Sequence, residues 1–309
     1  MTVQELRDWE RISAAVGESW KRNRDSPLEY TPKFIDSLAS YPGGLPVISP
    51  ALFDGDQLAA FVLGFPRTFT LNRSVRKLLL MTLFTVAPAY QGRGLGRKIW
   101  AECVLQAFHA GYEGTLHYCV QGNISNAVTA AGASLAGFVS QHVLTIPYLM
   151  RMLRSHNENL RGDADPDLGT FLKYASLVPD IAVRRQWTEA EAIWQFNRPG
   201  AIAVTNPEIG ALTGFVMNVA DAQRTSVCFL EDILWQSDEG QRTALLSEFL
   251  LQAAARCSLA VAPVLGYADL QPLKDSGFRK SPRVLNAYLT PFMSLEASGV
   301  NQAIYADVL

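Results

Sequence analysis

The sequence has few of the residues that build metal sites or disulfide frameworks. Its 309 residues include only four cysteines, Cys103, Cys119, Cys228 and Cys257, and none of them forms a CxxC pair. Scattered cysteines of this kind indicate neither a zinc site nor a set of disulfides. We therefore expect no metal and a reducing compartment.

The chain also lacks an excess of positive charge and a long apolar run. Its 27 basic and 29 acidic residues give a formal net charge of -2, so no global field would attract nucleic acid. The longest apolar runs, such as "LLLMTLF", are far shorter than the ~20 residues that span a bilayer. The charged start, "MTVQELRDWERISAAV", has no apolar core of a signal peptide. These features predict a soluble, cytoplasmic protein with no nucleic-acid or membrane partner.

What the sequence does contain is enough apolar material for packed cores. Hydrophobic residues make up 49% of the chain and charged residues 18%, which is typical of globular proteins. At roughly 150 residues per domain, the length suggests two domains. Apolar runs at residues 58–65, 77–88, 114–121 and 138–147 predict strands, and residues 97–112 and 124–137 have helical patterns.

A glycine-rich loop, "VAPAYQGRGLGRKIW" at residues 86–100, joins the second of these strands to the first helix. Gly92, Gly94 and Gly96 remove side chains where a helix begins and leaves backbone N–H groups unpaired. Such a helix terminus stabilises an anion. The cations around it are Arg93, Arg97 and Lys98. The loop therefore predicts a ligand that carries phosphate.

Two common nucleotide motifs do not fit this loop. A Walker loop needs GxxxxGK[ST], and no Lys-Ser or Lys-Thr follows these glycines. A Rossmann fingerprint needs GxGxxG, whereas Gly92 to Gly96 reads GxGxG.

The loop resembles the acyl-CoA site of the GNAT superfamily of N-acyltransferases. The family signature Q/R-x-x-G-x-G/A stands here as Gln91-Gly92-Arg93-Gly94-Leu95-Gly96, after Val86-Ala87-Pro88. The family's Asn early in the next helix and its closing Gly-Phe correspond to Asn126 and Gly137-Phe138. The resemblance covers roughly residues 45–146.

The resemblance implies a fold, a co-substrate and its binding residues. The implied fold is of the α/β class, or α+β in some schemes, with a mixed, mostly antiparallel sheet flanked by helices. Acetyl-CoA or another acyl-CoA would bind with its pyrophosphate on the loop amides and its pantetheine arm along the preceding strand. The residues implied are Phe84, Thr85, Val86, Gln91, Gly92, Arg93, Gly94, Leu95, Gly96, Arg97 and Asn126.

Catalytic groups are less clear. Many family members carry a Tyr acid at the position of Ala133 and a carboxylate on the central strand, which here reads "LLMTLF". His117, on the strand beside the expected cleft, is the candidate base and predicts a rate that rises through neutral pH. The alternative is that His117 is a packed or surface imidazole.

The second half weakly repeats the first. The segment "LTGFVMNV" is similar to "LAAFVLGF" of the first half. In the second half, however, the loop "QSDEGQR" places Asp238 and Glu239 at the position where a phosphate would bind. We therefore predict a GNAT domain at residues 1–153, a linker at 154–168 and a degenerate GNAT-like domain at 169–309. Two unrelated halves are the alternative. Glu231 and Asp232 would reach an acceptor amine, or they would have exposed-strand or structural roles.

The function predicted is acetyl transfer from acetyl-CoA to a primary amine on a small molecule or peptide. One alternative is an acyl-CoA-binding protein without turnover. Another is GNAT-like chemistry on a thiol acceptor, or decarboxylation of an acyl-CoA.

Overall fold

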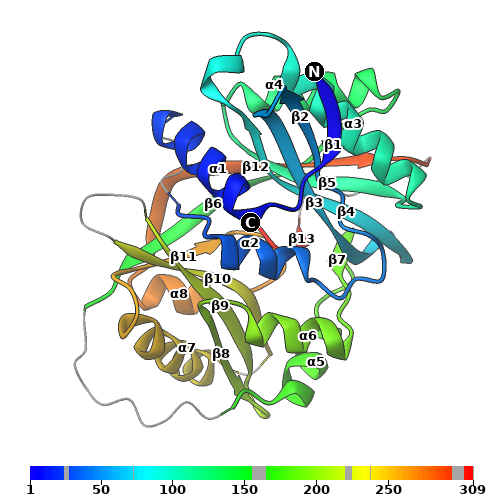
Figure 1. Cartoon of the computed structure of the whole chain (residues 1–309). Helices are drawn as coiled ribbons and strands as arrows, with labels where there is room; N and C mark the ends of the chain where they lie inside the picture. Colours follow the sequence, from blue (N-terminus) through cyan, green and yellow to red (C-terminus); the bar gives the residue numbers. More distant parts are fainter. Residues whose placement is uncertain are drawn as a thin grey trace. The chain divides into compact units, whose positions relative to one another are not determined.

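The structure is a computed structural model and describes residues 1–23, 28–71, 73–154, 165–219, 225–236, 238–293 and 303–308. The chain forms two compact units, each built from a sheet and helices (Figure 1). The first unit comprises Met1–Thr145 and Leu285–Asn301, and the second comprises Ile146–Val284 and Gln302–Val308.

The first unit has a six-stranded mixed sheet in the order β1-β2-β3-β4-β5-β12. All neighbours in this sheet are antiparallel except β4 and β5, which are parallel. Its elements are β1 (Thr2–Glu5), α1 (Trp9–Asn23), α2 (Pro32–Ala39), β2 (Pro50–Asp54), β3 (Gln57–Leu71), β4 (Ser74–Val86), the 3-10 helix η1 (Pro88–Tyr90), α3 (Leu95–His109), β5 (Gly114–Val120) and α4 (Ser125–Leu135). The predicted mixed sheet flanked by helices is confirmed.

The core of this unit lies between α3 and the central strands. Ile99, Cys103 and Val104 of α3 have no exposed surface and pack with Leu79 and Met81 of β4. Their spacing follows the helical period, so one face of α3 is apolar and the other carries charges. Burial of these side chains fixes the strand, loop and helix that form the candidate site.

The second unit has a five-stranded sheet in the order β6-β11-β10-β9-β8. Its neighbours are antiparallel except β10 and β11, which are parallel. Its elements are β6 (Gln141–Met152), α5 (Leu168–Ser176), β7 (Val183–Arg185), α6 (Glu189–Asn197), β8 (Ala201–Asn206), β9 (Gly210–Asn218), β10 (Ser226–Trp235), α7 (Glu239–Ala254), β11 (Leu259–Pro263), α8 (Gln271–Asp275) and β13 (Ile304–Tyr305). Strand β13 pairs with β7.

Each unit takes its last strand from a distant part of the chain. In the first unit, β12 (Arg279–Pro291) pairs with β5 through Leu285 to Pro291. In the second unit, β6 pairs with β11 through Tyr148 to Met152. Because each compact unit contains a segment from the other half of the chain, the domain boundaries 1–153 and 169–309 stay a prediction. The linker predicted at 154–168 lies largely outside the described residues.

The strand predicted at residues 138–147 begins later than expected, at Gln141. Gly137 has a φ of 86°, and the N–H of Phe138 donates to Ala133 O at 2.9 Å. This turn closes α4, so Phe138 belongs to the helix end and not to the strand.

Within the described ranges, no helix is long and apolar enough to cross a membrane. The same residues contain no group of three or more His, Cys, Asp or Glu side chains placed to hold a metal ion.

Candidate acyl-CoA site

The glycine loop ends at the N-terminus of α3, where backbone amides are open. Gly94 is the N-cap of α3 in the left-handed conformation, with φ 75° and no side-chain capping bond. The first bond of the helix runs from Lys98 N to Gly94 O. The N–H groups of residues 95–97 precede that bond and have no partner among the described residues. This is the arrangement that binds a phosphate.

The three glycines serve two different purposes. A Cβ on Gly92 would meet nothing within 4 Å, and one on Gly94 would meet only the flexible end of Arg97, at 3.3 Å. Both residues have positive φ, so their need for glycine comes from the backbone. A Cβ on Gly96 would lie 3.0 Å from both Phe84 and Val128. Gly96 therefore lets α3 approach β4 and α4.

The loop is held by its own side chains. Gln91 Nε2 donates to Val86 O at 3.2 Å and folds the loop onto the end of β4. Tyr90 OH donates to Gln57 Oε1 at 2.8 Å, and Arg93 lies over the Tyr90 ring at 5.2 Å. The exposed cations beside the open amides are Arg93, Arg97 and Lys98.

Strands β4 and β5 separate beside this loop. Their parallel pairing ends at Met81 and His117, although β4 continues to Val86 and β5 to Val120. A bulge at Leu83, with φ 53°, bends β4 at the same point. Beyond it, the edge of β4 that faces β5 pairs with no strand among the described residues. Such an edge has backbone groups with which an extended ligand can pair.

The end of β4 is also fixed from the other side by α1. Trp20 Nε1 donates to Thr85 Oγ1 at 3.1 Å, and Ser19 Oγ donates to Val86 O at 3.1 Å. Thr85 Oγ1 in turn donates to Leu83 O at 2.9 Å. The sequence signature did not reveal this support, because Trp20 lies 65 residues before Thr85.

His117 is buried and not open to a cleft. Only 1% of its surface is exposed, and its Nε2 is 3.2 Å from Thr129 Oγ1. Its ring stacks on Tyr288 and packs edge-on against Trp100. Burial lowers the pKa of His117 to about 3, so the ring is neutral at physiological pH. The predicted titration of this residue near neutral pH is therefore not supported.

This burial has a measurable consequence for His117→Gln. We expect the variant to keep the wild-type dependence of rate on pH from pH 5 upward. Because the pKa is lowered in the folded state, the neutral ring favours folding above the ordinary imidazole range, and this contribution is lost as pH falls toward 3. Denaturation at several pH values should show that the free energy of unfolding decreases less at acid pH in the variant than in the wild type. A rate step near neutral pH that the variant lacks would restore His117 as a base.

Asn126 is committed to the protein. Its Nδ2 donates to Val120 O at 2.8 Å and to Asn123 O at 2.7 Å. Its Oδ1 accepts from Tyr288 OH at 2.9 Å. The side chain thus links the end of β5 to the start of α4. A ligand beside it would contact a side-chain amide whose position is fixed by these hydrogen bonds. Sequence reasoning missed Tyr288 because β12 brings it from 162 residues away.

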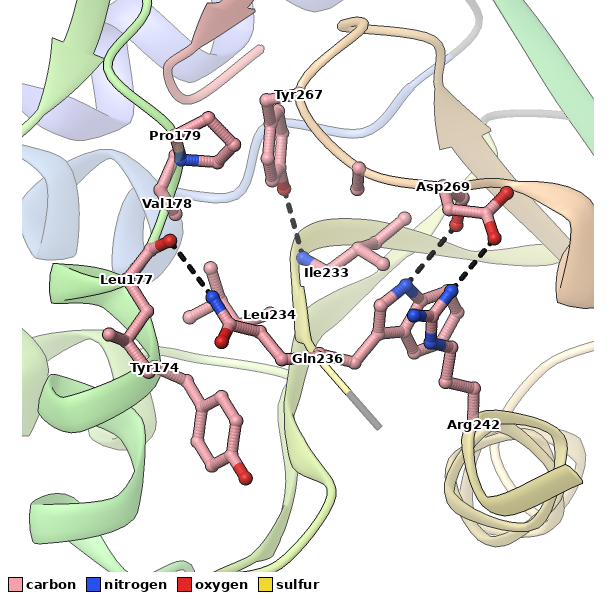
Figure 2. Close-up of a pocket in the computed structure, with 12 residues that line it drawn as sticks. Tyr174, Leu177, Val178, Pro179, Ile233, Leu234, Gln236, Arg242, Tyr267 and Asp269 are labelled. Carbon is pink, nitrogen blue, oxygen red and sulfur yellow. Dashed lines mark hydrogen bonds and ion pairs between the residues drawn. The ribbon is translucent and has the colours of Figure 1, made fainter. Parts of the chain in front are cut away.

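The second unit has a comparable separation of strands, but its own side chains fill it (Figure 2). Pairing of β10 with β11 ends at Phe229 and Val261. Beyond that point Tyr267 OH accepts from Ile233 N at 3.0 Å and lies 3.5 Å from Glu231 O. The backbone groups that a ligand amide could use here are thus met by a tyrosine hydroxyl.

The N-terminus of α7 in the second unit is closed as well. The Asp238 side chain caps the helix by accepting from Gln241 N at 3.0 Å. Arg242 beside it pairs with Asp269 at 2.8 Å. A cavity of about 320 Å³ remains between these groups and Tyr174 of α5. The N-terminus of α7 thus carries the Asp238 carboxylate, whereas the N-terminus of α3 in the first unit has open backbone amides.

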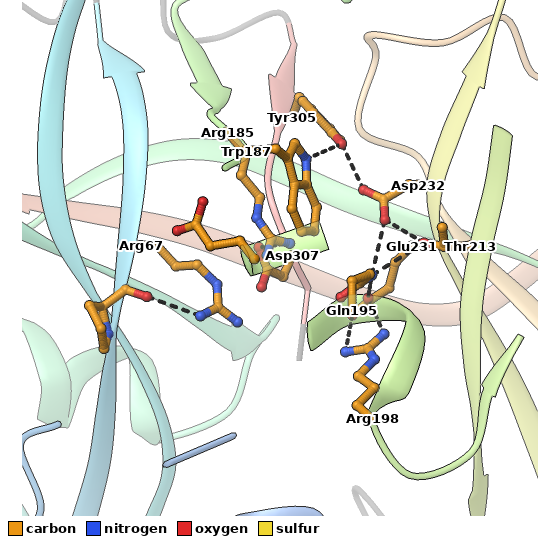
Figure 3. A network of polar contacts seen from close by, with 12 residues as sticks. Arg67, Arg185, Trp187, Gln195, Arg198, Thr213, Glu231, Asp232, Tyr305 and Asp307 are labelled. Carbon is orange, nitrogen blue, oxygen red and sulfur yellow. Dashed lines mark hydrogen bonds and ion pairs between the residues drawn. The ribbon is translucent and has the colours of Figure 1, made fainter. Parts of the chain in front are cut away.

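Glu231 and Asp232 lie in a buried network of the second unit (Figure 3). Glu231 pairs with Arg198, and Gln195 Nε2 donates to Glu231 at 2.7 Å and to Asp232 at 3.0 Å. Asp232 also accepts from Tyr305 OH at 2.8 Å. Burial raises the pKa of Glu231 despite the nearby guanidinium. These contacts favour the structural alternative for both carboxylates.

Comparison with known proteins identifies the family of this site. Residues 4–129 match the model of the acetyltransferase (GNAT) family. This match confirms the resemblance for the part of the chain that carries the glycine loop. A comparison with curated protein sequences gave no match.

Solved structures with a similar fold include N-myristoyltransferase from Saccharomyces cerevisiae. A crystal structure with bound myristoyl-CoA has 14% identity and a TM-score of 0.69, and covers 94% of this chain and 82% of that chain. Another, with bound myristoyl-CoA and inhibitors, has 13% identity and a TM-score of 0.71, and covers 100% and 86% respectively. The family match thus covers residues 4–129, and the similarity to these solved structures shows a shared fold.

Proposed function

We propose that this protein is an N-acyltransferase that transfers acetyl from acetyl-CoA to a primary amine, with the co-substrate bound in the first unit. The observation that carries the proposal is the uncapped N-terminus of α3 beside separated strands. Amides of residues 92–97 would hold the pyrophosphate, and the backbone of Phe84, Thr85 and Val86 would pair with the pantetheine arm. The end of the pairing between β4 and β5 at Met81 and His117 supports this placement of the arm.

The reaction makes modest demands on side chains. The amine attacks the thioester carbonyl, a C–N bond forms, the C–S bond breaks and the thiolate leaves. The proton lost by the amine balances the one gained by the thiol. A thiol is a good leaving group at neutral pH, so holding the two reactants in line can supply several kcal/mol of the rate acceleration. Burial of His117 fits a site that acts mainly by position.

The test of activity follows free thiol while acetyl-CoA is incubated with a panel of primary amines, including a peptide with a free N-terminus. We expect thiol release that depends on one of the amines and a product that is heavier than that amine by one acetyl group. Binding without thiol release would favour an acyl-CoA-binding protein. Thiol release without an N-acetyl product would favour a thiol acceptor or decarboxylation.

Each chain should bind one acyl-CoA. In the second unit, Tyr267 OH accepts from the backbone N–H of Ile233, and Asp238 caps α7. Both contacts support a degenerate copy that binds no acyl-CoA. Calorimetry with acetyl-CoA should therefore give a stoichiometry of one, and Tyr267→Phe should leave that value unchanged. A fitted stoichiometry of two in the wild type would contradict this prediction.

A further inference from the structure

An aromatic layer closes the interior of the first unit at the point where β4 and β5 separate. The layer consists of Phe84, Trp100, His117 and Tyr288. Ring centroids are 5.3 Å apart for Phe84 and Trp100, 4.6 Å for Trp100 and His117, and 5.3 Å for His117 and Tyr288. The rings come from β4, α3, β5 and β12, so the layer links both of the separating strands to α3.

Trp100 is the central member of this layer and is tightly packed. Only 2% of its surface is exposed. A Cβ on Gly132 of α4 would lie 2.7 Å from Trp100 Cβ and 2.8 Å from its Cδ1. The next residue, Ala133, is fully buried. Small residues on α4 therefore make room for the indole, which fills the volume on that side of the separated strands.

Two polar atoms mark this layer as different from ordinary core. Trp100 Nε1 and His117 Nδ1 are both buried, and neither has a hydrogen-bond partner among the described residues. A buried indole N–H usually has an acceptor. A polar group brought to the layer by a ligand, such as a thioester carbonyl, would supply one.

We propose that Trp100 sets the length of the acyl group that this protein accepts. The proposal rests on the proposed function. Pairing of the two strands ends at His117, so an acyl group that leaves the separated strands toward the helices meets the aromatic layer at once. Acetyl and similarly short acyl groups end before they reach the aromatic layer. A longer chain needs the volume that the indole and its neighbours occupy, because a packed interior does not yield without cost.

The experiment compares the affinities of CoA, acetyl-CoA, butyryl-CoA and octanoyl-CoA for the wild type and three variants. The wild type should bind octanoyl-CoA at least about tenfold more weakly than acetyl-CoA, and Trp100→Ala should reduce that ratio by on the order of tenfold. Phe84→Leu, a smaller change, should shift the ratio in the same direction. Trp194→Ala alters a half-buried tryptophan of the second unit and should leave the ratio unchanged.

Two results would overturn the proposal while leaving the proposed function intact. One is equal affinity of the wild type for acetyl-CoA and octanoyl-CoA. The other is an unchanged ratio in folded Trp100→Ala and Phe84→Leu. If Trp100→Ala does not fold, the wild-type series and Phe84→Leu decide the matter. Failure of the wild type to bind even free CoA would instead overturn the proposed function, and this proposal with it.

Discussion

Gly94→Val is expected to weaken acyl-CoA binding by at least about 100-fold, the loss of two charge-assisted hydrogen bonds. Gly94 has a φ of 75° at the N-cap of α3. A β-branched residue is strongly disfavoured in that conformation, so the loop must rearrange and turn its amides away from a common centre. The valine would also project toward the space in which the pyrophosphate is proposed to lie.

Gly111→Val is the matched control for this change. Gly111 lies just beyond the other end of α3 and has a φ of 86°. A Cβ on Gly111 would meet nothing within 4 Å, and one on Gly94 would meet only the flexible end of Arg97. Both variants should lose stability by similar amounts, about 1–2 kcal/mol or more for a residue in the left-handed region. Calorimetry should then find lost affinity only for Gly94→Val. Equal affinity of the two folded variants would contradict the placement of the phosphate.

Glu231→Ala is expected to lower the free energy of unfolding by about 3–5 kcal/mol, because it leaves the Arg198 guanidinium buried without its carboxylate. Arg198 is 4% exposed and Glu231 7%. Gln195 would lose one of its acceptors as well. A loss of that size corresponds to a decrease in Tm of roughly 10 °C. A decrease of only one or two degrees would mean that the network is open to water.

Glu231→Gln separates charge from hydrogen bonding at the same position. The pKa of Glu231 is raised in the folded state by burial, so its contribution to stability is complete below the ordinary carboxyl range and is lost as pH rises through the raised value. The stability of the wild type relative to Glu231→Gln should therefore decrease with rising pH. A difference that increases with pH would mean that Arg198 dominates and lowers the pKa.

Local patterns predicted the elements that carry the site. The apolar run before the loop, the glycines and the helical period after it predicted β4, the loop and α3, because each depends on neighbours within about twenty residues. The two strands on either side of the cleft, β4 and β5, were predicted in the same way. The need for glycine at Gly92 and Gly94 also follows from local backbone conformation.

Contacts between distant segments could not be predicted. Tyr288 reaches Asn126 and His117 only because β12 pairs with β5, and nothing in the local pattern of either strand identifies its neighbour. His117 looked available for catalysis because a strand pattern does not reveal that Trp100 and Tyr288 cover the ring. Glu231 and Asp232 were uncertain for the same reason, since the partners that bury them include Tyr305, seventy-three residues from Asp232.

The most direct test of the central claim is calorimetric titration of the wild-type chain with acetyl-CoA, repeated with Gly94→Val. We expect saturable binding to the wild type with a stoichiometry of one, and loss of this binding in the variant. If the wild type binds neither acetyl-CoA nor CoA at millimolar ligand, the proposed acyl-CoA site is wrong.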